Sequence, residues 1–189
     1  MQPVDDALTS GVILRNAGRF VFQVGYNAAR DALGVVRIGG HVEPGEPAAQ
    51  TAVRESLEEA GTRVTLIPSP RTYQYETGDD IIELVPTTWD AGPPAPLLLA
   101  EVTGSSSSGL SVTYLAESSD SPVPAGETQA LLFLTPAEVR LISESSLTLG
   151  ELIRIGGVVE DPSGLPHHLP LRPHGQARAL SILLERAEM

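Results

Sequence analysis

The residues with the clearest chemical potential lie in one short stretch, from Gly40 to Thr62. They follow the pattern G-x5-E-x7-R-E-x-x-E-E-x-G, and fixed offsets of this kind do not arise easily by chance. The specified positions are Gly40, Glu46, Arg54, Glu55, Glu58, Glu59 and Gly61. Proteins usually hold Mg2+ through one or two carboxylates together with substrate phosphates. The stretch therefore indicates a magnesium site that acts on a phosphorylated compound.

We predict one helix across this stretch. Pro47 suits a first helical position and Gly61 suits the helix end. At about 100° per residue, the three glutamates after Arg54 share one face. The opposite face carries the apolar residues Ala49, Val53, Leu57 and Ala60. We expect the apolar face to pack against the protein and the acidic face to meet solvent.

A simpler interpretation is that the glutamates form a solvated helix face, as acidic clusters usually do. The preceding loop argues against it, because Gly39, Gly40 and Gly45 allow the backbone to turn tightly and to approach a ligand. The helix N-terminus also offers unpaired amides to an anion. We therefore favour a site, and we expect Arg37, Gly39 and Gly40 to bind the substrate.

The pattern resembles the signature of the Nudix hydrolases. In that family, the loop and helix coordinate a metal that bridges a diphosphate, and water attacks one phosphorus. The resemblance implies that the carboxylates of Glu55 and Glu59 and the Gly40 carbonyl are metal ligands, with Glu58 as either a further ligand or an outer-shell partner. It implies Mg2+ as the ion, with Mn2+ as a substitute, and it gives Arg54 the role of orienting the neighbouring glutamate.

The family leaves the general base open between the helix, at Glu55, and a later loop. Glu127 lies just before the apolar run Ala130 to Leu134, where many members place an additional carboxylate. We list Glu55, Glu58, Arg54 and Glu127 as candidate catalytic residues. The alternative for Glu127 is a solvated glutamate in the turn beside Gly126.

Ser56 and Thr62 stand where the family usually has aliphatic residues. Ser56 falls at the edge of the predicted apolar face, so we expect weaker packing there without loss of chemistry. His167, His168 and His174 lack a recognised zinc spacing, and we expect them in a surface loop.

The remaining elements favour an α/β class fold. Strands are predicted at Gly11–Leu14, Arg19–Val24, Val64–Ile67, Thr72–Tyr75, Leu110–Ala116 and Ala130–Leu134. Thr135 and Glu138 form a capping box that opens a second helix, and a third is predicted at His174–Glu188. This order agrees with a mixed β-sheet between helices, the α/β/α sandwich that the resemblance implies.

The chain is long enough for one sizeable core, so we predict a single domain over residues 1–189. The segment of about 76–109 contains Pro86, Pro93, Pro94 and Pro96, and we expect it to be mostly a loop insertion. Such a loop either binds the substrate or a second copy in a homodimer, or it is a tether without specific contacts.

The composition limits the function classes. The 189 residues carry a net charge of -12, which argues against a nucleic-acid polymer as the partner. The absence of cysteine excludes disulfides and thiol chemistry. No apolar run reaches the roughly 18 residues of a membrane span, and we expect a cytoplasmic protein without a membrane partner.

We therefore predict a metal-dependent hydrolase that cleaves the diphosphate linkage of a small molecule. The substrate is either a nucleoside diphosphate linked to another moiety or a nucleotide triphosphate. One alternative is a catalytically inactive module of the same fold that senses nucleotides or mediates an interaction. Another is an isomerase of isoprenoid diphosphates, which ranks last because the chain has no cysteine for the nucleophilic role.

Overall fold

The computed structural model describes residues 7–77, 82–90, 92–103 and 108–188. The strands are β1 (Ala7–Asn16), β2 (Arg19–Asn27), β3 (Ala32–Val36), β4 (Ile38–His41), β5 (Thr65–Ile67), β6 (Thr72–Thr77), β7 (Ile82–Thr87), β8 (Leu98–Thr103), β9 (Ser108–Glu117), β10 (Ala130–Leu134), β11 (Val158–Glu160) and β12 (Leu171–Pro173). The helices are α1 (Ala48–Ala60), α2 (Pro136–Glu144), α3 (Leu149–Arg154) and α4 (Gly175–Glu185).

All of these strands belong to one mixed sheet, whose longest path runs β11-β10-β2-β1-β9-β8-β6-β7. β1 lies at its centre and pairs antiparallel with β2 and β4 but parallel with β9, about a hundred residues further along the chain. Val12, Ile13 and Leu14 are all fully buried. Such a continuous apolar run is expected of a strand that is covered on both faces.

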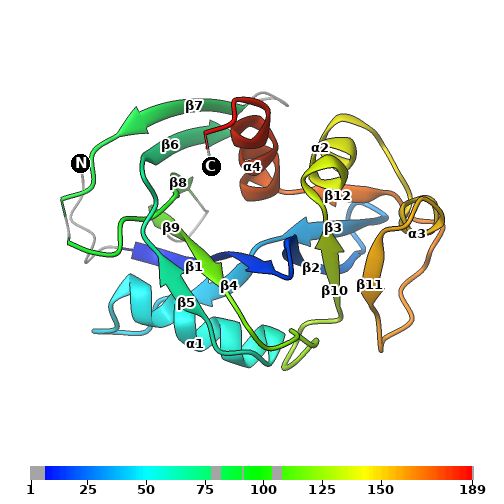
Figure 1. Cartoon of the computed structure of the whole chain (residues 1–189). Coiled ribbons are helices and arrows are strands. Elements are labelled where there is room, and N and C mark those ends of the chain that lie inside the picture. The colour runs from blue at the N-terminus through cyan, green and yellow to red at the C-terminus, as the bar shows by residue number, and fades with distance from the viewer. Residues whose placement is uncertain (1–6, 78–81, 91, 104–107, 189) are drawn as a thin grey trace.

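Helices cover both faces of the sheet. Figure 1 shows α1 on one side, and α2 and α4 on the other. Successive side chains of a strand point to opposite faces, so Val12 and Leu14 pack on the α1 side while Ile13 packs on the other. The prediction of a mixed sheet between helices is confirmed. No helix in the described part of the chain is long and apolar enough to cross a membrane.

The predicted helix of the glycine and glutamate stretch is α1, but its inward face was predicted wrongly. Val53 and Leu57 are 38% and 48% exposed. The buried residues are Ala48, Thr51, Ala52, Glu55, Ser56 and Ala60. Small side chains on this face let the helix lie close to the sheet, and Glu55 on the same face is carried inward with them.

Ser56 shows the same effect. It is fully buried, not at the edge of a packed face, and its Oγ donates a hydrogen bond to the Ala52 carbonyl at 2.7 Å. The bond satisfies a hydroxyl that would otherwise be costly to bury. A small residue whose hydroxyl bonds within the helix is therefore accommodated at this position, where the family usually has an aliphatic side chain.

The expectation of mostly loop between residues 76 and 109 is also wrong. β7 and β8 lie inside this segment; β6 pairs antiparallel with β7 and parallel with β8, and β8 pairs antiparallel with β9. Pro86 sits in β7, at the edge of the sheet, where a missing N–H is tolerated, whereas Pro93, Pro94 and Pro96 lie in the connection between β7 and β8. Leu97, Leu98 and Leu99 supply buried apolar contacts. Residues 78–81, 91 and 104–107 of this segment lie outside the described residues.

A buried arginine fixes the approach to α1. Arg37 is only 6% exposed, and its guanidinium donates to the Ile38 carbonyl at 3.3 Å and to the Ser111 hydroxyl at 3.4 Å. Gly11 and Gly39 make room for it, since a Cβ at these positions would lie 2.0 Å and 1.9 Å from Arg37 Nη1. The arginine therefore occupies space that two glycines leave beneath the loop.

We predict that Gly11→Ala lowers the free energy of unfolding by about 1–3 kcal/mol or more, the usual cost of overpacking. The added methyl would also lie 2.1 Å from the Ile38 carbonyl oxygen, and the backbone cannot easily yield there. Urea unfolding measures the change. Gly25→Ala is the matched control, because its Cβ meets only the flexible end of Gln129 at 3.3 Å. Equal stabilities for the two variants would contradict this account of the loop.

Candidate active site

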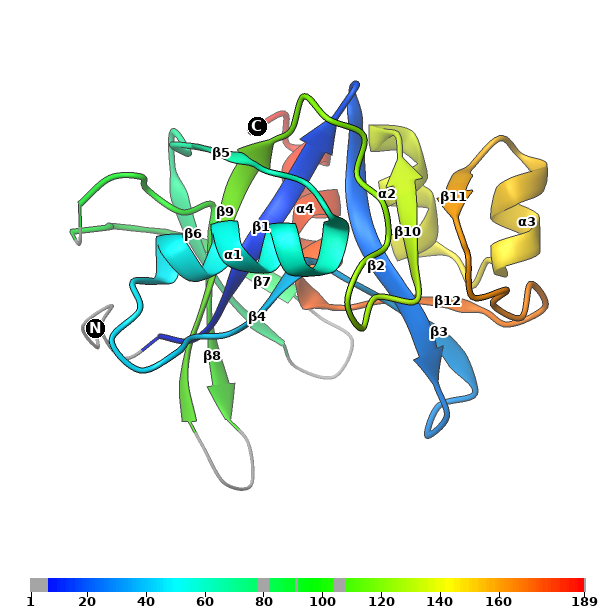
Figure 2. The same cartoon turned by 90° about the horizontal axis from the view of Figure 1, so that it is seen from below.

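The candidate site lies where α1 meets the strands before it. β4 leads through a turn at Gly45 into the helix, and Gly61 ends the helix in the left-handed conformation, with φ 58°. The segment before β10 holds the other end of α1: the Ala125 N–H donates to the Glu59 carbonyl at 3.0 Å. Figure 2 shows this segment running past the end of the helix. The loop directly before α1 and the segment before β10, which is distant in sequence, therefore both contact one helix.

Arg54 bonds to three carboxylates. Its Nε and Nη2 donate to the two oxygens of Glu46, each at 3.0 Å. Its Nη1 donates to Glu55 at 2.7 Å and to Glu58 at 2.9 Å. The hydrogen bonds from Arg54 are the main reason why the pKa of Glu46 falls to about 2. These contacts support the predicted role of Arg54 in orienting Glu55.

Glu55 faces the glycine loop and is only 8% exposed. A Cβ on Gly40 would lie 2.6 Å from Oε1 of Glu55 and 2.7 Å from Oε2. Only glycine leaves room for the carboxylate against this backbone. The structure therefore brings Gly40 and Glu55 together, as the resemblance implied for two metal ligands.

Glu59 lies one helical turn further along, half-buried against the same loop. Its Oε2 accepts a hydrogen bond from the Gly39 N–H at 2.7 Å and another from the Gln23 side chain. Desolvation is the main cause that raises the pKa of Glu59 to about 7, and the negative charge of Glu55 adds to it. In the described part of the chain its hydrogen-bond donors are neutral, so a cation beside it would offset the cost of ionisation.

The donor set suits a hard divalent cation, because Glu55, Glu58 and Glu59 offer carboxylate oxygens beside a backbone carbonyl. Within the described residues, no three His, Cys, Asp or Glu side chains are arranged around one point that could hold a metal ion. The oxygens of these glutamates instead bond to Arg54, Gly39 and Gln23. Metal binding would therefore exchange some of these hydrogen bonds for coordination.

The loop that carries Glu127 reaches the edge of this site. Glu127 is exposed and lines a hollow of about 460 Å3 together with Gln23. The Thr128 hydroxyl donates to the Gln23 side-chain oxygen at 3.2 Å, and Gln23 in turn donates to Glu59. The structure thus connects the Glu127 loop to Glu59 through Gln23.

Arg37 has a different position from the one its predicted substrate contact requires. Its guanidinium is buried below the loop and donates to backbone and hydroxyl oxygens there. Gly39 and Gly40 do lie beside Glu59 and Glu55 at the site, and their contact with the substrate stays a prediction. We therefore treat Arg37 as a support of the glycine loop.

Gln23 is the main residue that the sequence interpretation missed. It is the polar residue in the otherwise apolar run from Phe20 to Val24 of β2. A polar side chain at an otherwise buried strand position is a signal that it has a specific partner. That signal was visible in the sequence, but the partner, Glu59, was not.

Glu59 makes the stability of the metal-free protein depend on pH. Its pKa is raised from 4.5 to about 7, so the folded state binds the proton more tightly than the unfolded state. The stabilisation from this proton is complete below pH 4.5 and is lost as the pH rises through 7. Urea unfolding with a chelator across this range measures it. Glu59→Gln should become more stable relative to the wild type as the pH rises, and parallel curves would contradict the assignment.

Comparison with known proteins places these features in a family. The NUDIX domain model matches residues 7–147. Among solved structures, a NUDIX-family hydrolase from Clostridium perfringens is 18% identical, with 71% of this chain and 84% of that chain covered and a TM-score of 0.49. An Ap4A hydrolase from C. elegans is 17% identical over 72% and 85% of the two chains, with a TM-score of 0.47. A MutT NUDIX hydrolase from Burkholderia pseudomallei is 18% identical over 84% and 99%, with a TM-score of 0.44.

No curated protein matches the sequence. The TM-scores of the three structures are all below 0.5, so the assignment rests on the domain model, which covers most of the chain. The match includes the whole glycine and glutamate stretch and the Glu127 loop. The chain therefore belongs to the NUDIX domain family and is a Nudix-type hydrolase.

Proposed function

We propose that this protein is a metal-dependent pyrophosphohydrolase of small molecules. Its substrate is a nucleoside diphosphate linked to another moiety, or a nucleotide triphosphate. The observation that carries the proposal is the position of Glu55 and Glu59, both turned from α1 toward the loop of Gly39 and Gly40. A carboxylate pair against a glycine backbone suits a cation shared with a diphosphate.

The cation would be held by the Gly40 carbonyl and by Glu55, Glu58 and Glu59, with Mg2+ preferred and Mn2+ as a substitute. When bound, it would neutralise phosphate charge and make phosphorus more electrophilic. The chain itself contributes orientation. Arg54 holds the Glu55 carboxylate at 2.7 Å, and the Gly39 N–H holds Glu59 at 2.7 Å. Gly39 and Gly40 leave the space that the Arg37 guanidinium and the Glu55 carboxylate occupy.

The general base is either Glu55 or Glu127. Glu55 is buried and bonded to Arg54, which restricts its rotamers. Glu127 is exposed at the edge of the site, where it can reach a water in the neighbouring hollow. Either carboxylate would take the proton of the attacking water as the bond to phosphorus forms.

A turnover screen tests the activity itself. Phosphate release from nucleotide sugars, triphosphates and dinucleoside polyphosphates should appear with Mg2+ or Mn2+ and disappear with a chelator, because the carboxylates alone offer no electrophilic assistance. Hydrolysis that persists in the chelator would contradict the metal-dependent mechanism. If no compound is turned over and one of them raises the melting temperature, the protein is instead a sensor of that compound.

Glu59→Gln should lower kcat by about 100-fold or more while the protein stays folded, because it removes one charged metal ligand. Steady-state kinetics at saturating Mg2+ measure the effect, and a thermal melt confirms the fold. Glu160→Gln, an exposed change of the same type in β11, is the matched control and should retain full activity. Near-normal turnover of the Glu59 variant would reject its assignment as a ligand.

Comparison of Glu127→Gln with Glu55→Gln locates the base. If Glu127 accepts the proton, its variant should lose kcat with little change in KM, because the interaction acts mainly in the transition state. A large loss for Glu55→Gln alone would place the essential carboxylates within α1. Unchanged kcat and KM for the Glu127 variant would remove Glu127 from the catalytic residues.

A further inference from the structure

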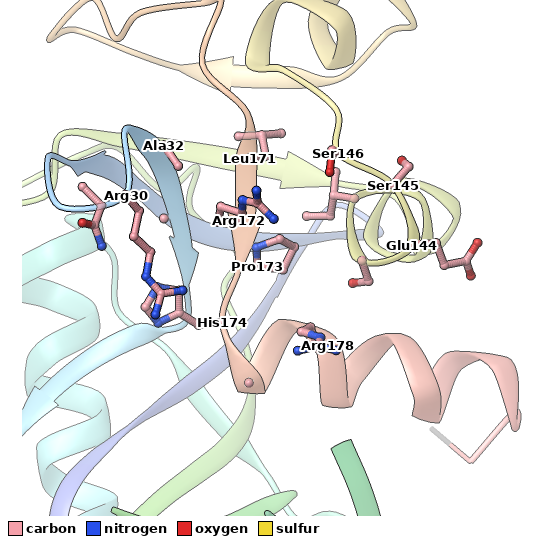
Figure 3. Close-up of a pocket in the computed structure, with 15 residues that line it drawn as sticks. Arg30, Ala32, Glu144, Ser145, Ser146, Leu171, Arg172, Pro173, His174 and Arg178 are labelled. Carbon is pink, nitrogen blue, oxygen red and sulfur yellow. The ribbon is translucent and has the colours of Figure 1, made fainter. Parts of the chain in front are cut away.

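A second cavity, of about 770 Å3, lies at the edge of the sheet beside β3 and β12, between the end of α2 and the start of α4. Basic residues from separate parts of the chain line it. They are Arg30, Arg172, His174 and Arg178. Figure 3 shows Arg30 extending toward the His174 ring, with Arg172 on β12 and Arg178 on α4 around the same space. One acidic side chain, Glu144, also lines the cavity.

This gathering of positive charge is unusual for the chain. The protein has 12 basic and 24 acidic residues, and three of its arginines line this one cavity. In the described part of the chain, neither Arg30 nor Arg172 forms an ion pair with a carboxylate. Like charges that are close together repel, and a bound anion would remove this repulsion.

The backbone holds these side chains on one face. In the parallel pairing of β12 with β3, Arg172 lies opposite Gly34. The His174 N–H donates to the Val35 carbonyl at 2.9 Å, and a Cβ on Gly34 would lie 3.3 Å from the His174 Nε2. Partial desolvation and then the charge of Arg30 lower the pKa of His174. Gly34 therefore leaves room for the His174 ring against β3, on the strand face where it pairs with Arg172.

The cavity adjoins the hollow at the edge of the candidate active site, and we call the two together the groove. Asn27 and Gly34 line both this cavity and the hollow that contains Gln23 and Glu127. Gly25 pairs with Gly34 in the register of β2 and β3, and the Gln129 side chain and the His174 ring lie against these two glycines. The length of β2 from Gln23, at the active-site end, to Asn27, which also lines the cavity, is four residue steps. At about 3.3 Å per strand residue, this separates the two ends of the groove by roughly 13 Å. Gln23 itself bonds to Glu59.

We propose that Arg30, Arg172 and His174 bind a second phosphate of the substrate, at the far end of this groove from the hydrolysed diphosphate. The inference rests on the proposed function, because it treats the groove as one substrate site. It assigns the protein a substrate with phosphate at two separated places. The second phosphate belongs either to a longer polyphosphate chain or to the sugar of the nucleoside.

Binding is tested on the metal-free full-length chain, without turnover. Tripolyphosphate is the probe for a second phosphate in a polyphosphate chain. Adenosine 3′,5′-bisphosphate is the probe for a second phosphate on the sugar. An NMR titration of His174, assigned with His174→Gln, should show that one probe raises its pKa, since a nearby anion favours the imidazolium. Arg172→Gln should weaken binding of that probe by about tenfold, and the exposed control Arg71→Gln should not change it.

Turnover supplies the second measurement. The wild type should have a higher kcat/KM for a substrate that carries the second phosphate than for its counterpart without it. The quantity to compare is the kcat/KM for the substrate with the second phosphate divided by the kcat/KM for its counterpart. Arg30→Gln and Arg172→Gln should each reduce this ratio by about tenfold, mainly by raising KM for the first substrate, while Arg71→Gln leaves it unchanged. Dinucleoside polyphosphates of increasing length test whether the second phosphate belongs to a polyphosphate chain. Nucleoside diphosphate compounds with or without a 3′-phosphate test whether it belongs to the sugar.

The two hypotheses fail in different ways. If the probes shift His174 but no substrate is hydrolysed, the anion site stands and the proposed catalytic function fails. If substrates are hydrolysed but neither probe affects His174 and both arginine variants keep the wild-type ratio, the arginines are only solvated surface residues. That outcome overturns the second phosphate site and leaves the hydrolase assignment intact.

Discussion

The contacts of one guanidinium organise the site. Arg54 bonds to Glu46, Glu55 and Glu58, so carboxylates that would repel one another share a positive partner. These bonds tie the middle of α1 to the turn before it. Glu59, which lies outside this group, is tied to the Gly39 N–H instead. The loop and the helix are therefore linked through both the basic and the acidic side chains of the same motif.

This arrangement works only because α1 approaches the sheet closely. Ala48, Ala52 and Ser56 occupy the contact, and Gly40 leaves space for the Glu55 carboxylate. Burial then changes the chemistry, because desolvation raises the pKa of Glu59 to about 7. A site that keeps a carboxylate partly dehydrated favours any cation that can replace the missing water. The close packing of α1 and the raised pKa of Glu59 are therefore consequences of the same small residues.

The sequence predicted the parts of the structure that depend on local spacing. The limits of α1, the capping box of Thr135 and Glu138, and the central apolar strands all follow from such patterns. The inward face of α1 was not predicted. A helical wheel assigns Val53 and Leu57 to the core because they are apolar, and it does not show that Glu55 is buried against the glycine loop. β7 and β8 were missed because Pro86 within β7, and Pro93, Pro94 and Pro96 in the connection between the two strands, resemble loop signals. Gln23 was missed for a different reason, since only the fold brings it to Glu59.

The central claim is that the α1 carboxylates hold a divalent cation against the glycine loop. An electron paramagnetic resonance titration with Mn2+ above pH 7 tests it most directly, because free and bound Mn2+ give different signals. The wild type should bind Mn2+ at a defined site, and Glu55→Gln and Glu59→Gln should each weaken that binding by more than about tenfold. Equal Mn2+ binding by the wild type and both variants, or no binding by any of them, would contradict the account.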